Sequence, residues 1–200
     1  MDTTQTPLTL LRLWTVEEYH RMAKVGILQP DEPVELIAGQ IIRQMSPQGT
    51  PHATAIRLTR RLLDNRLREQ GLVQTQLPIQ LSNYSEPEPD LAVVMPDELR
   101  YLDHHPTPSE IYLIIEVADT TLKRDCELKA NHYAEAKIAD YWVIDLSNRQ
   151  LHVFRKPTDQ GYQSQVIIAD NQTILPLQFS DCLFTVSEML PPVIPEFVED

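Results

Sequence analysis

A single carboxylate, Glu116, interrupts the apolar run IYLIIEVA at residues 111–118. Runs that are apolar at successive positions are typical of strands that are covered on both faces in the middle of a sheet. An ionised carboxylate in such a strand lowers stability by several kcal/mol unless a cation or hydrogen bonds compensate its charge. We therefore expect Glu116 to have a partner, and we take it as the first candidate for chemistry.

A second acid, Asp90, stands directly before the apolar run LAVVM and 26 residues before Glu116. That separation accommodates a strand, a loop and a second strand, so the two carboxylates can meet across neighbouring strands. Mg²⁺ prefers one or two protein carboxylates and keeps its other positions for water and phosphate. Asp90 and Glu116 are therefore candidate ligands for Mg²⁺ or Mn²⁺.

Lys129 is the candidate cation, in the helical pattern DCELKANHYAEAK at residues 125–137. It lies four residues after Asp125 and four before Tyr133, so the three side chains share one face of a regular helix. Because this helix follows Glu116 in the chain, its first turn can lie over the end of the strand. A lysine beside two carboxylates would complete a site that cleaves phosphodiester bonds.

Each of these candidates also has a purely structural interpretation. Asp90 could be an ordinary loop acid, like its neighbours in EPEPD. Glu116 could form a buried ion pair with Lys123, Arg124 or Lys129. Lys129 could instead pair with Asp125 on an exposed helix face, a contact worth about 0.3–0.5 kcal/mol.

The elements that must position these residues alternate between helix and strand patterns. In chain order, the sequence predicts a helix over 15–28, a hairpin over 34–45, a long helix over 51–71, strands over 72–82, 91–95 and 111–118, a helix over 125–137, strands over 141–146, 151–156 and 162–169, and a last helix over 181–190. This order favours an α/β fold with a mixed central β-sheet flanked by helices.

The length of 200 residues favours one domain, which we place at 15–190 between an N-terminal arm (1–14) and an acidic, proline-rich tail (191–200). The 17 Lys and Arg against 29 Asp and Glu argue against broad, non-specific binding to nucleic acid or membranes. The exception to this acidic composition is the basic stretch 57–68. Its side chains could contact a phosphate backbone, or they could pair with surrounding acids.

Targeting and cofactor motifs are missing from the sequence. No signal peptide and no apolar run of membrane-spanning length is present, and Cys126 and Cys182 have no zinc-ligand spacing, so we expect a cytoplasmic protein with no membrane contact. The absence of GxxxxGK[ST], HExxH and GxSxG argues against nucleotide-driven, zinc-protease and serine-hydrolase chemistry.

The segments EPEPDLAVV and IIEVADTTLKRDCELKANHYAEAKIADYWVIDL resemble the PD-(D/E)XK nuclease superfamily, specifically its restriction-endonuclease branch known as the Uma family. The resemblance covers residues 15–190 and is most specific over 89–145. It implies a restriction-endonuclease-like fold and a Mg²⁺-dependent (or Mn²⁺-dependent) endonuclease that hydrolyses nucleic acid, with DNA favoured over RNA.

By this resemblance, Pro89-Asp90 matches the PD element and Glu116 its second acid, and the two carboxylates hold the metal together with the backbone carbonyl of Val117. The superfamily usually has a lysine two residues after that acid, where this chain has Ala118. In the Uma branch the lysine lies on the following helix, where Lys129 matches.

Two further residues match the Uma branch as candidate catalytic groups. Glu35, in VELIAGQI, resembles the acid that begins its N-terminal hairpin, and His52 resembles a histidine at the start of its long helix. Either side chain can reach metal, phosphate or a catalytic water, and the sequence assigns neither role.

Two hypotheses from other functional classes stay open. A catalytically inactive nuclease-fold module could bind nucleic acid or protein, as the negative net charge and Ala118 suggest. A structural homodimer whose strands pair across an interface would need a cationic partner for Glu116 and no metal. A homodimer also fits the nuclease reading, because nucleases that cut both strands often act as dimers.

Overall fold

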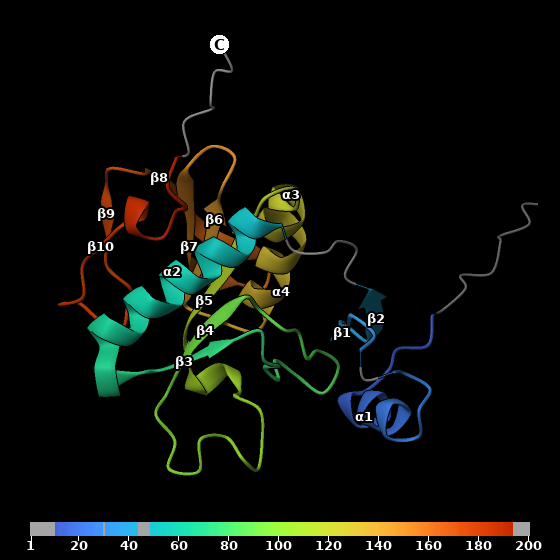
Figure 1. The fold of residues 1–200 in the computed structure, drawn as a ribbon. Helices are drawn as coiled ribbons and strands as arrows, with labels where there is room; N and C mark the ends of the chain where they lie inside the picture. Colours follow the sequence, from blue (N-terminus) through green and yellow to red (C-terminus); the bar gives the residue numbers. More distant parts are fainter. Residues whose placement is uncertain (1–10, 30, 44–48, 194–200) are drawn as a thin grey trace, which may run out of the picture.

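A six-stranded mixed sheet is the centre of the computed structural model, which describes residues 11–29, 31–43 and 49–193 (Figure 1). In spatial order the strands are β3 (Leu72–Thr75), β4 (Leu91–Val94), β5 (Ile111–Ala118), β6 (Asp140–Asp145), β7 (Gln150–Thr158) and β8 (Gly161–Ala169). β5 and β6 are parallel, and the other neighbouring pairs are antiparallel. The expected mixed sheet flanked by helices is confirmed.

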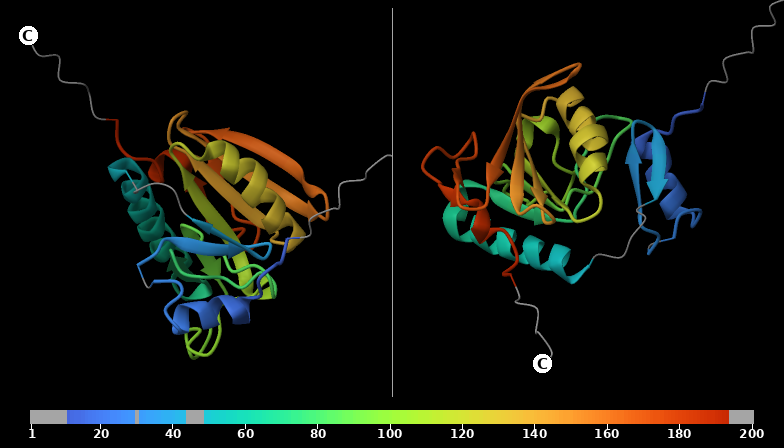
Figure 2. Two further views of the ribbon diagram at one scale, coloured as in Figure 1. Left: turned by 90° about the vertical axis from the view of Figure 1, so that its right-hand side faces the viewer. Right: turned by 90° about the horizontal axis from the view of Figure 1, so that it is seen from above.

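The parallel β5–β6 pair requires a crossover connection, because parallel strands cannot be joined by a tight turn. Here the crossover consists of α3 (Leu122–Arg124), a π-helical turn η3 (Asp125–Lys129) and α4 (Ala130–Glu135). It lies on the face of the sheet opposite α2 (Thr50–Leu67), as the view from above shows (Figure 2).

Alternate residues of β5 contribute to two separate cores, one on each face of the sheet. Leu113 and Ile115 belong to the core under α2, and Ile114 and Ala118 belong to the core under α4. Because side chains alternate along a strand, Glu116 lies on the α4 face. This burial on both faces explains the apolar run in the sequence.

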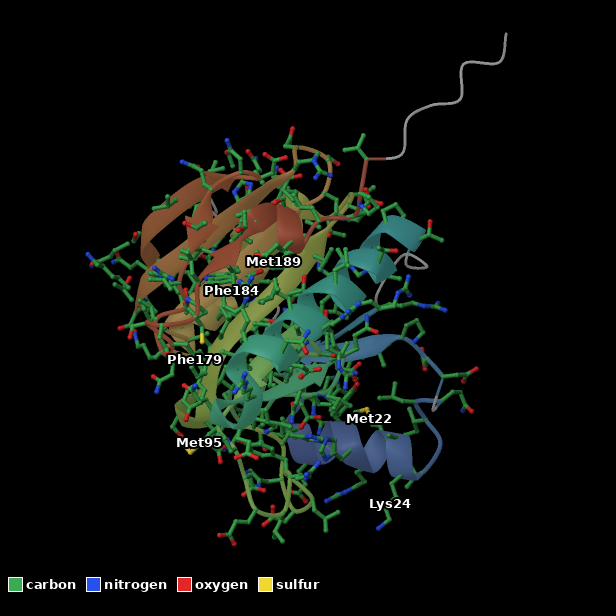
Figure 3. The ribbon with its side chains drawn as sticks, turned by 60° about the vertical axis from the view of Figure 1, so that its left-hand side comes forward. Met22, Lys24, Met95, Phe179, Phe184 and Met189 are labelled. Atoms are coloured by element: carbon green, nitrogen blue, oxygen red, sulfur yellow. The ribbon has the colours of Figure 1, made fainter. Side chains whose placement is uncertain are left out.

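The C-terminal segment completes the core on the α2 face. It contains β9 (Thr173–Ile174), β10 (Phe184–Thr185) and the 3₁₀ turn η4 (Val186–Glu188). Figure 3 shows Phe179, Phe184 and Met189 on this segment, and all three belong to the same buried cluster as residues of α2. The expected helix over 181–190 is wrong, because Phe184 is drawn into a strand pair with Ile174 and packs edge-on against Trp142.

The N-terminal part consists of α1 (Val16–Lys24) and a hairpin of β1 (Val34–Ile37) and β2 (Gln40–Arg43), which lie side by side (Figure 1). A capping box of Thr15 and Glu18 begins α1. The hairpin turns at Ala38 and Gly39, whose φ angles are 49° and 74°. The hairpin is attached to the chain before β4, where the Glu86 N–H donates to the Leu36 carbonyl at 2.7 Å.

Two expected elements differ from the structure in extent. The strand predicted over 72–82 ends at Thr75, because Gln76 adopts a positive φ of 50° and the chain then leaves the sheet. The helix predicted over 125–137 contains the π-helical turn and ends at Glu135. Most of the predicted arm and tail lie outside the described residues. Within the described ranges, no helix is both long and apolar enough to cross a membrane.

The double-sided burial of β5 predicts a large effect of truncating its side chains. Ile115 is fully buried, whereas Ile167 on the edge strand β8 is 54% exposed. We expect Ile115→Ala to lower the free energy of unfolding by about 2–5 kcal/mol and Ile167→Ala to change it by less than about 0.5 kcal/mol. Urea unfolding of both variants measures this difference, and equal losses would contradict the assigned core.

Candidate active site

The partner that Glu116 requires is Lys129. The Lys129 ammonium donates to Glu116 Oε1 at 2.8 Å, and the Tyr133 hydroxyl donates to the same oxygen at 2.8 Å. Glu116 is 3% exposed and Lys129 8% exposed, so both charges are removed from water. Of the three ion pairs that the sequence left open, the structure forms the one with Lys129.

The π-helical turn η3 places Lys129 against the strand. The Ala130 N–H donates to the Asp125 carbonyl, five residues earlier, which is the hydrogen bond of a π-turn. Asp125 and Lys129 are both buried by this turn, and the Thr121 hydroxyl donates to Asp125 Oδ2 at 2.6 Å. Short π-turns within helices occur frequently at functional sites.

Asp90 lies beside Glu116 on the same face of the sheet. Leu91 of β4 pairs with Ile115 of β5, so Asp90 stands opposite Glu116 at the next position of this antiparallel register. The Asp90 N–H lies 3.4 Å from Glu116 Oε2, and the Val117 N–H donates to Asp90 Oδ2 at 2.9 Å. The two carboxylates thus converge at the end of β4.

One oxygen of each carboxylate has only a long hydrogen bond. Glu116 Oε2 accepts from the Asp90 N–H at 3.4 Å, and Asp90 Oδ1 accepts from the Gln76 side chain at 3.3 Å. The N–H and carbonyl of one residue leave a strand on the same side, so the Val117 carbonyl, like its N–H, faces Asp90. Two carboxylate oxygens and a carbonyl are hard donors that fit Mg²⁺ or Mn²⁺.

His52 supports Asp90 from the first turn of α2. Its Nε2 lies 3.2 Å from Asp90 Oδ2. Burial alone would lower the pKa of His52, but the hydrogen bond and charge of Asp90 raise it above the ordinary value. Asp90 therefore stabilises the protonated form of His52 relative to a free imidazole.

Glu35 reaches the same region from the hairpin. It is 1% exposed, and Arg124 donates to its Oε1 at 2.7 Å while the Glu88 N–H donates to Oε2 at 3.3 Å. The acid expected from the family resemblance is thus close to the site, where it forms an ion pair with a residue of α3.

A single cleft of about 790 Å³ joins these groups. Its lining includes all five side chains that the sequence singled out as catalytic candidates: Glu35, His52, Asp90, Glu116 and Lys129. It also includes Val117 and further residues that the sequence did not assign to the site, among them Gln76, Glu88, Thr121 and Arg124.

The cleft carries more acidic than basic side chains. Its lining contains six acids, Glu35, Glu88, Asp90, Glu116, Asp125 and Glu127, against the basic residues Lys123, Arg124 and Lys129. Burial raises the pKa of Glu116 to about 8 against the opposing charge of Lys129. Burial and the charges of Glu35 and Glu86 raise the pKa of Glu88. A cation bound among these acids would lower their mutual repulsion.

Lys129 stays positively charged in this setting. Burial alone would lower its pKa, but the neighbouring carboxylates of Glu116, Glu35 and Asp125 raise it above the ordinary value. A buried lysine that keeps its proton can hold one carboxylate and still present hydrogen-bond donors to a second group.

Tyr133 contributes a hydrogen bond to the site as well as packing. Its ring lies 4.8 Å from that of Tyr141, and its hydroxyl donates to Glu116. In the sequence, this contact was indicated by the position of Tyr133 four residues after Lys129, on the same helix face. No pattern in the sequence indicated that Gln76 and Arg124 lie at the site, because the position of each depends on how distant segments of the chain meet.

The basic stretch 57–68 is partly neutralised by neighbouring acids. Arg60 lies 3.6 Å from Asp64, and Arg66 lies 2.6 Å from Glu188. These pairs agree with the simpler of its two interpretations, a solvated helix face that pairs with surrounding acids.

Comparisons with known proteins agree with the family resemblance found in the sequence. The model of the Uma2 family, described as "Putative restriction endonuclease", matches residues 16–187. A crystal structure of "a putative nuclease belonging to DUF820" from Anabaena variabilis is similar, with a TM-score of 0.66 and 17% identity over 88% of this chain and 96% of that one. At this identity the likeness shows the fold alone. No curated protein matches the chain.

The buried ion pair predicts a pH-dependent loss of stability when Lys129 is replaced by Met. Without the lysine, burial raises the pKa of Glu116 unopposed, so the folded chain retains a proton that the unfolded chain releases above its ordinary pKa of 4.5. A carboxyl group whose pKa is higher in the folded chain than in the unfolded chain stabilises the fold at pH values below its unfolded-state pKa. This stabilisation is lost as the pH rises towards the folded-state pKa. Because the pKa of Glu116 in wild type is itself about 8, the further loss in the variant relative to wild type develops above that pH, and urea unfolding of metal-free Lys129→Met should show a loss of about 3–5 kcal/mol near pH 9.5.

The loss relative to wild type should be smaller near pH 7, and above pH 8 it should grow by up to about 1.4 kcal/mol per pH unit. The control is the double variant Lys129→Met/Glu116→Gln, which has no carboxylate at position 116. It should lack this slope. If the pH profiles of the single and double variants run parallel, the pKa of Glu116 does not depend on Lys129, which would contradict this prediction.

Proposed function

This chain belongs to the Uma2 family of restriction-endonuclease-like proteins, and from that premise we propose that it is a metal-dependent endonuclease that hydrolyses phosphodiester bonds of DNA. Nucleases of this type usually use a divalent metal ion, and the family implies a nucleic-acid substrate. We propose Mg²⁺ or Mn²⁺ as the ion, with Asp90, Glu116 and the Val117 carbonyl as its protein ligands.

One observation carries the proposal: a buried lysine and two converging carboxylates lie in the wall of a single open cleft. A structural ion pair alone explains the contact between Lys129 and Glu116, but it gives no reason for Asp90 to stand beside it with a weakly bonded oxygen. It also gives no reason for further acids to line the same cleft. A divalent cation explains both features.

In the proposed reaction, the oxygen of a water molecule bonds to phosphorus while the bond from phosphorus to the leaving sugar oxygen breaks. The attacking water releases one proton to solvent and the leaving oxygen takes up one proton from solvent, so the products are a phosphate monoester and a sugar hydroxyl. The bound ion supplies Lewis-acid polarisation of the phosphate and a lowered pKa for water. Lys129 donates hydrogen bonds to the attacking water or to a phosphate oxygen, where it stabilises the developing negative charge. Glu116 holds the Lys129 ammonium in place for this role.

The other candidate residues act around this centre. His52 positions Asp90 through the contact to Oδ2 and keeps that oxygen occupied, so Oδ1 is the oxygen directed to the ion. Glu35 supports a second ion or the attacking water. Arg124 lies at the cleft beside Glu35 and can contact a substrate phosphate.

The remaining parts of the proposal concern the setting in which the protein acts. We propose a cytoplasmic enzyme, and a homodimer where both strands of a duplex are cut, because two sites are then brought to the two backbones. The rival function is a nuclease-fold module that binds nucleic acid or protein without cleaving it. The replacement of the usual lysine by Ala118 and the net charge of -12 are the observations that favour it.

Cleavage of DNA tests the proposal directly. Supercoiled, linear and single-stranded DNA are incubated with wild type, Glu116→Gln and Lys129→Met in the presence of Mn²⁺ or Mg²⁺. We expect wild type to cleave, and both variants to be slower by at least about 100-fold, because each loses a ligand or a charge-stabilising donor. Glu135→Gln, an exposed acid of α4, is the matched control and should retain activity.

Wild-type inactivity on all three DNA forms, equal to that of Glu116→Gln, would contradict the nuclease proposal and favour the binding module. Loss of activity in Glu135→Gln to the same degree would show that the effect of Glu116→Gln is not specific to the site.

Metal binding provides an independent test that does not require the correct substrate. Titration of wild type with Mn²⁺ by calorimetry should show binding that Asp90→Asn and Glu116→Gln abolish, because each variant loses a charged oxygen ligand. Glu135→Gln should bind as wild type does. Unchanged Mn²⁺ binding in Asp90→Asn and Glu116→Gln would place the ion elsewhere.

A further inference from the structure

A second group of metal-ligating side chains lies outside the cleft. His20, Glu86 and His105 each offer one ligand atom, and these atoms all lie within 4.8 Å of one another. None of the three lines the candidate active site. We propose that they form a binding site for Zn²⁺ or a similar first-row transition-metal ion, separate from the nuclease chemistry and independent of it.

Glu86 is the centre of this group. Its side chain is 3% exposed, and its Oε1 lies 2.6 Å from Nε2 of His20. Its Oε2 is buried and has no hydrogen-bond partner among the described residues. A buried carboxylate oxygen without a donor is costly, and nearly all such groups in folded proteins are satisfied by protein, water or an ion. A metal ion between Glu86 and the histidines would provide the missing interaction.

His105 faces this group, whereas its neighbour His104 does not. The rings of His20 and His105 have centroids 6.3 Å apart and planes inclined by 77°. His104 instead contacts Asp103 at 2.7 Å and Glu110 at 3.1 Å. The rings of adjacent residues cannot easily share one ion. The structure separates them, and only His105 joins the proposed site.

Two imidazoles and one carboxylate are a ligand set that suits Zn²⁺ rather than Mg²⁺. Zinc accepts histidine nitrogen at about 2.0–2.1 Å and carboxylate oxygen at about 2.0–2.2 Å, whereas Mg²⁺ and Ca²⁺ prefer oxygen donors. Ligands of one such ion are about 3–4 Å apart. The present spread of up to 4.8 Å therefore closes by rotation of the two histidines, neither of which is buried.

The site is accessible to an ion from solution. The His20 side chain is 52% exposed and lines a hollow of about 440 Å³ together with residues of the start of α1, Gln80 and Asn83. Three protein ligands leave one position of a tetrahedral ion for water. An ion bound by this group would take the place of the hydrogen bond between His20 Nε2 and Glu86 Oε1.

The proposed ion would join three segments that are distant in sequence. His20 belongs to α1, Glu86 to the chain before β4, and His105 to the loop between β4 and β5. Glu86 also pairs with Leu36 of β1, the strand that carries Glu35. Metal binding would therefore fix the N-terminal helix and hairpin on the rest of the fold. An ion that binds only the folded state stabilises a protein by RT ln(1 + [metal]/Kd), so the effect grows with the logarithm of the metal concentration above Kd.

The test is titration of the untagged, full-length protein with Zn²⁺ by calorimetry and with Co²⁺ by visible absorption, which reports nitrogen and oxygen ligation. We expect wild type to bind both ions and to melt at a higher temperature with Zn²⁺. His20→Ala and His105→Ala should each weaken Zn²⁺ binding by at least about 100-fold, since loss of an outer-shell partner alone costs about 10–100-fold. Both replaced side chains are at least partly exposed, so the fold should persist, which circular dichroism verifies.

His104→Ala is the matched control, with the neighbouring histidine removed, and it should bind Zn²⁺ as wild type does. Asp90→Asn, in the cleft, should also retain this binding. Because the acidic cleft can itself take up Zn²⁺, the histidine variants are compared in the Asp90→Asn background. Zn²⁺ binding that survives there in His20→Ala and His105→Ala, or that is absent from Asp90→Asn alone, would overturn the proposal. Absence of Zn²⁺ and Co²⁺ binding to wild type would overturn it as well.

Discussion

The buried ion pair between Glu116 and Lys129 is the interaction on which the arrangement of this protein depends. A carboxylate in the middle strand of a sheet that is covered on both faces is tolerated only with a cation at hydrogen-bond distance. The cation must come from the crossover that joins β5 to β6, because this segment covers the face to which Glu116 points. The charge of Glu116 therefore depends on three features of the fold: the parallel strand pair, the crossover and its π-turn.

The strand register of the sheet is enough to place the second carboxylate, that of Asp90, beside Glu116. The antiparallel register of β4 and β5 sets Asp90 opposite Glu116, and the Val117 N–H holds its side chain at the strand end. The start of α2 and the N-terminal hairpin then bring His52 and Glu35 to the same cleft. Because these segments supply more acids than bases, the cleft is better suited to a divalent cation than to an anion alone. A phosphate group can bind there with the ion and Lys129 as its positive partners.

The sequence predicts much of the fold, and it predicts that Glu116 and Lys129 meet, for physical reasons. Glu116 was identifiable because a charge in an apolar run is costly, and Lys129 because it lies on the next helix at a fixed interval from Asp125 and Tyr133. The hairpin and α1 followed from local signals at Ala38-Gly39 and Thr15. Local signals failed where tertiary contacts decide the structure. Phe184 forms a strand pair in place of the helix expected over 181–190, and Gln76 ends β3 early. The π-turn at 125–129 and the meeting of His20, Glu86 and His105 also depend on packing between distant segments.

The central claim is that Asp90 and Glu116 share one divalent ion beside the Lys129 ammonium. Anomalous scattering from crystals grown with Mn²⁺ locates such an ion without reference to any substrate. The account predicts an anomalous peak within about 2.0–2.4 Å of one oxygen from each carboxylate and of the Val117 carbonyl. An occupied Mn²⁺ site elsewhere in the molecule, with no peak between Asp90 and Glu116, would contradict it.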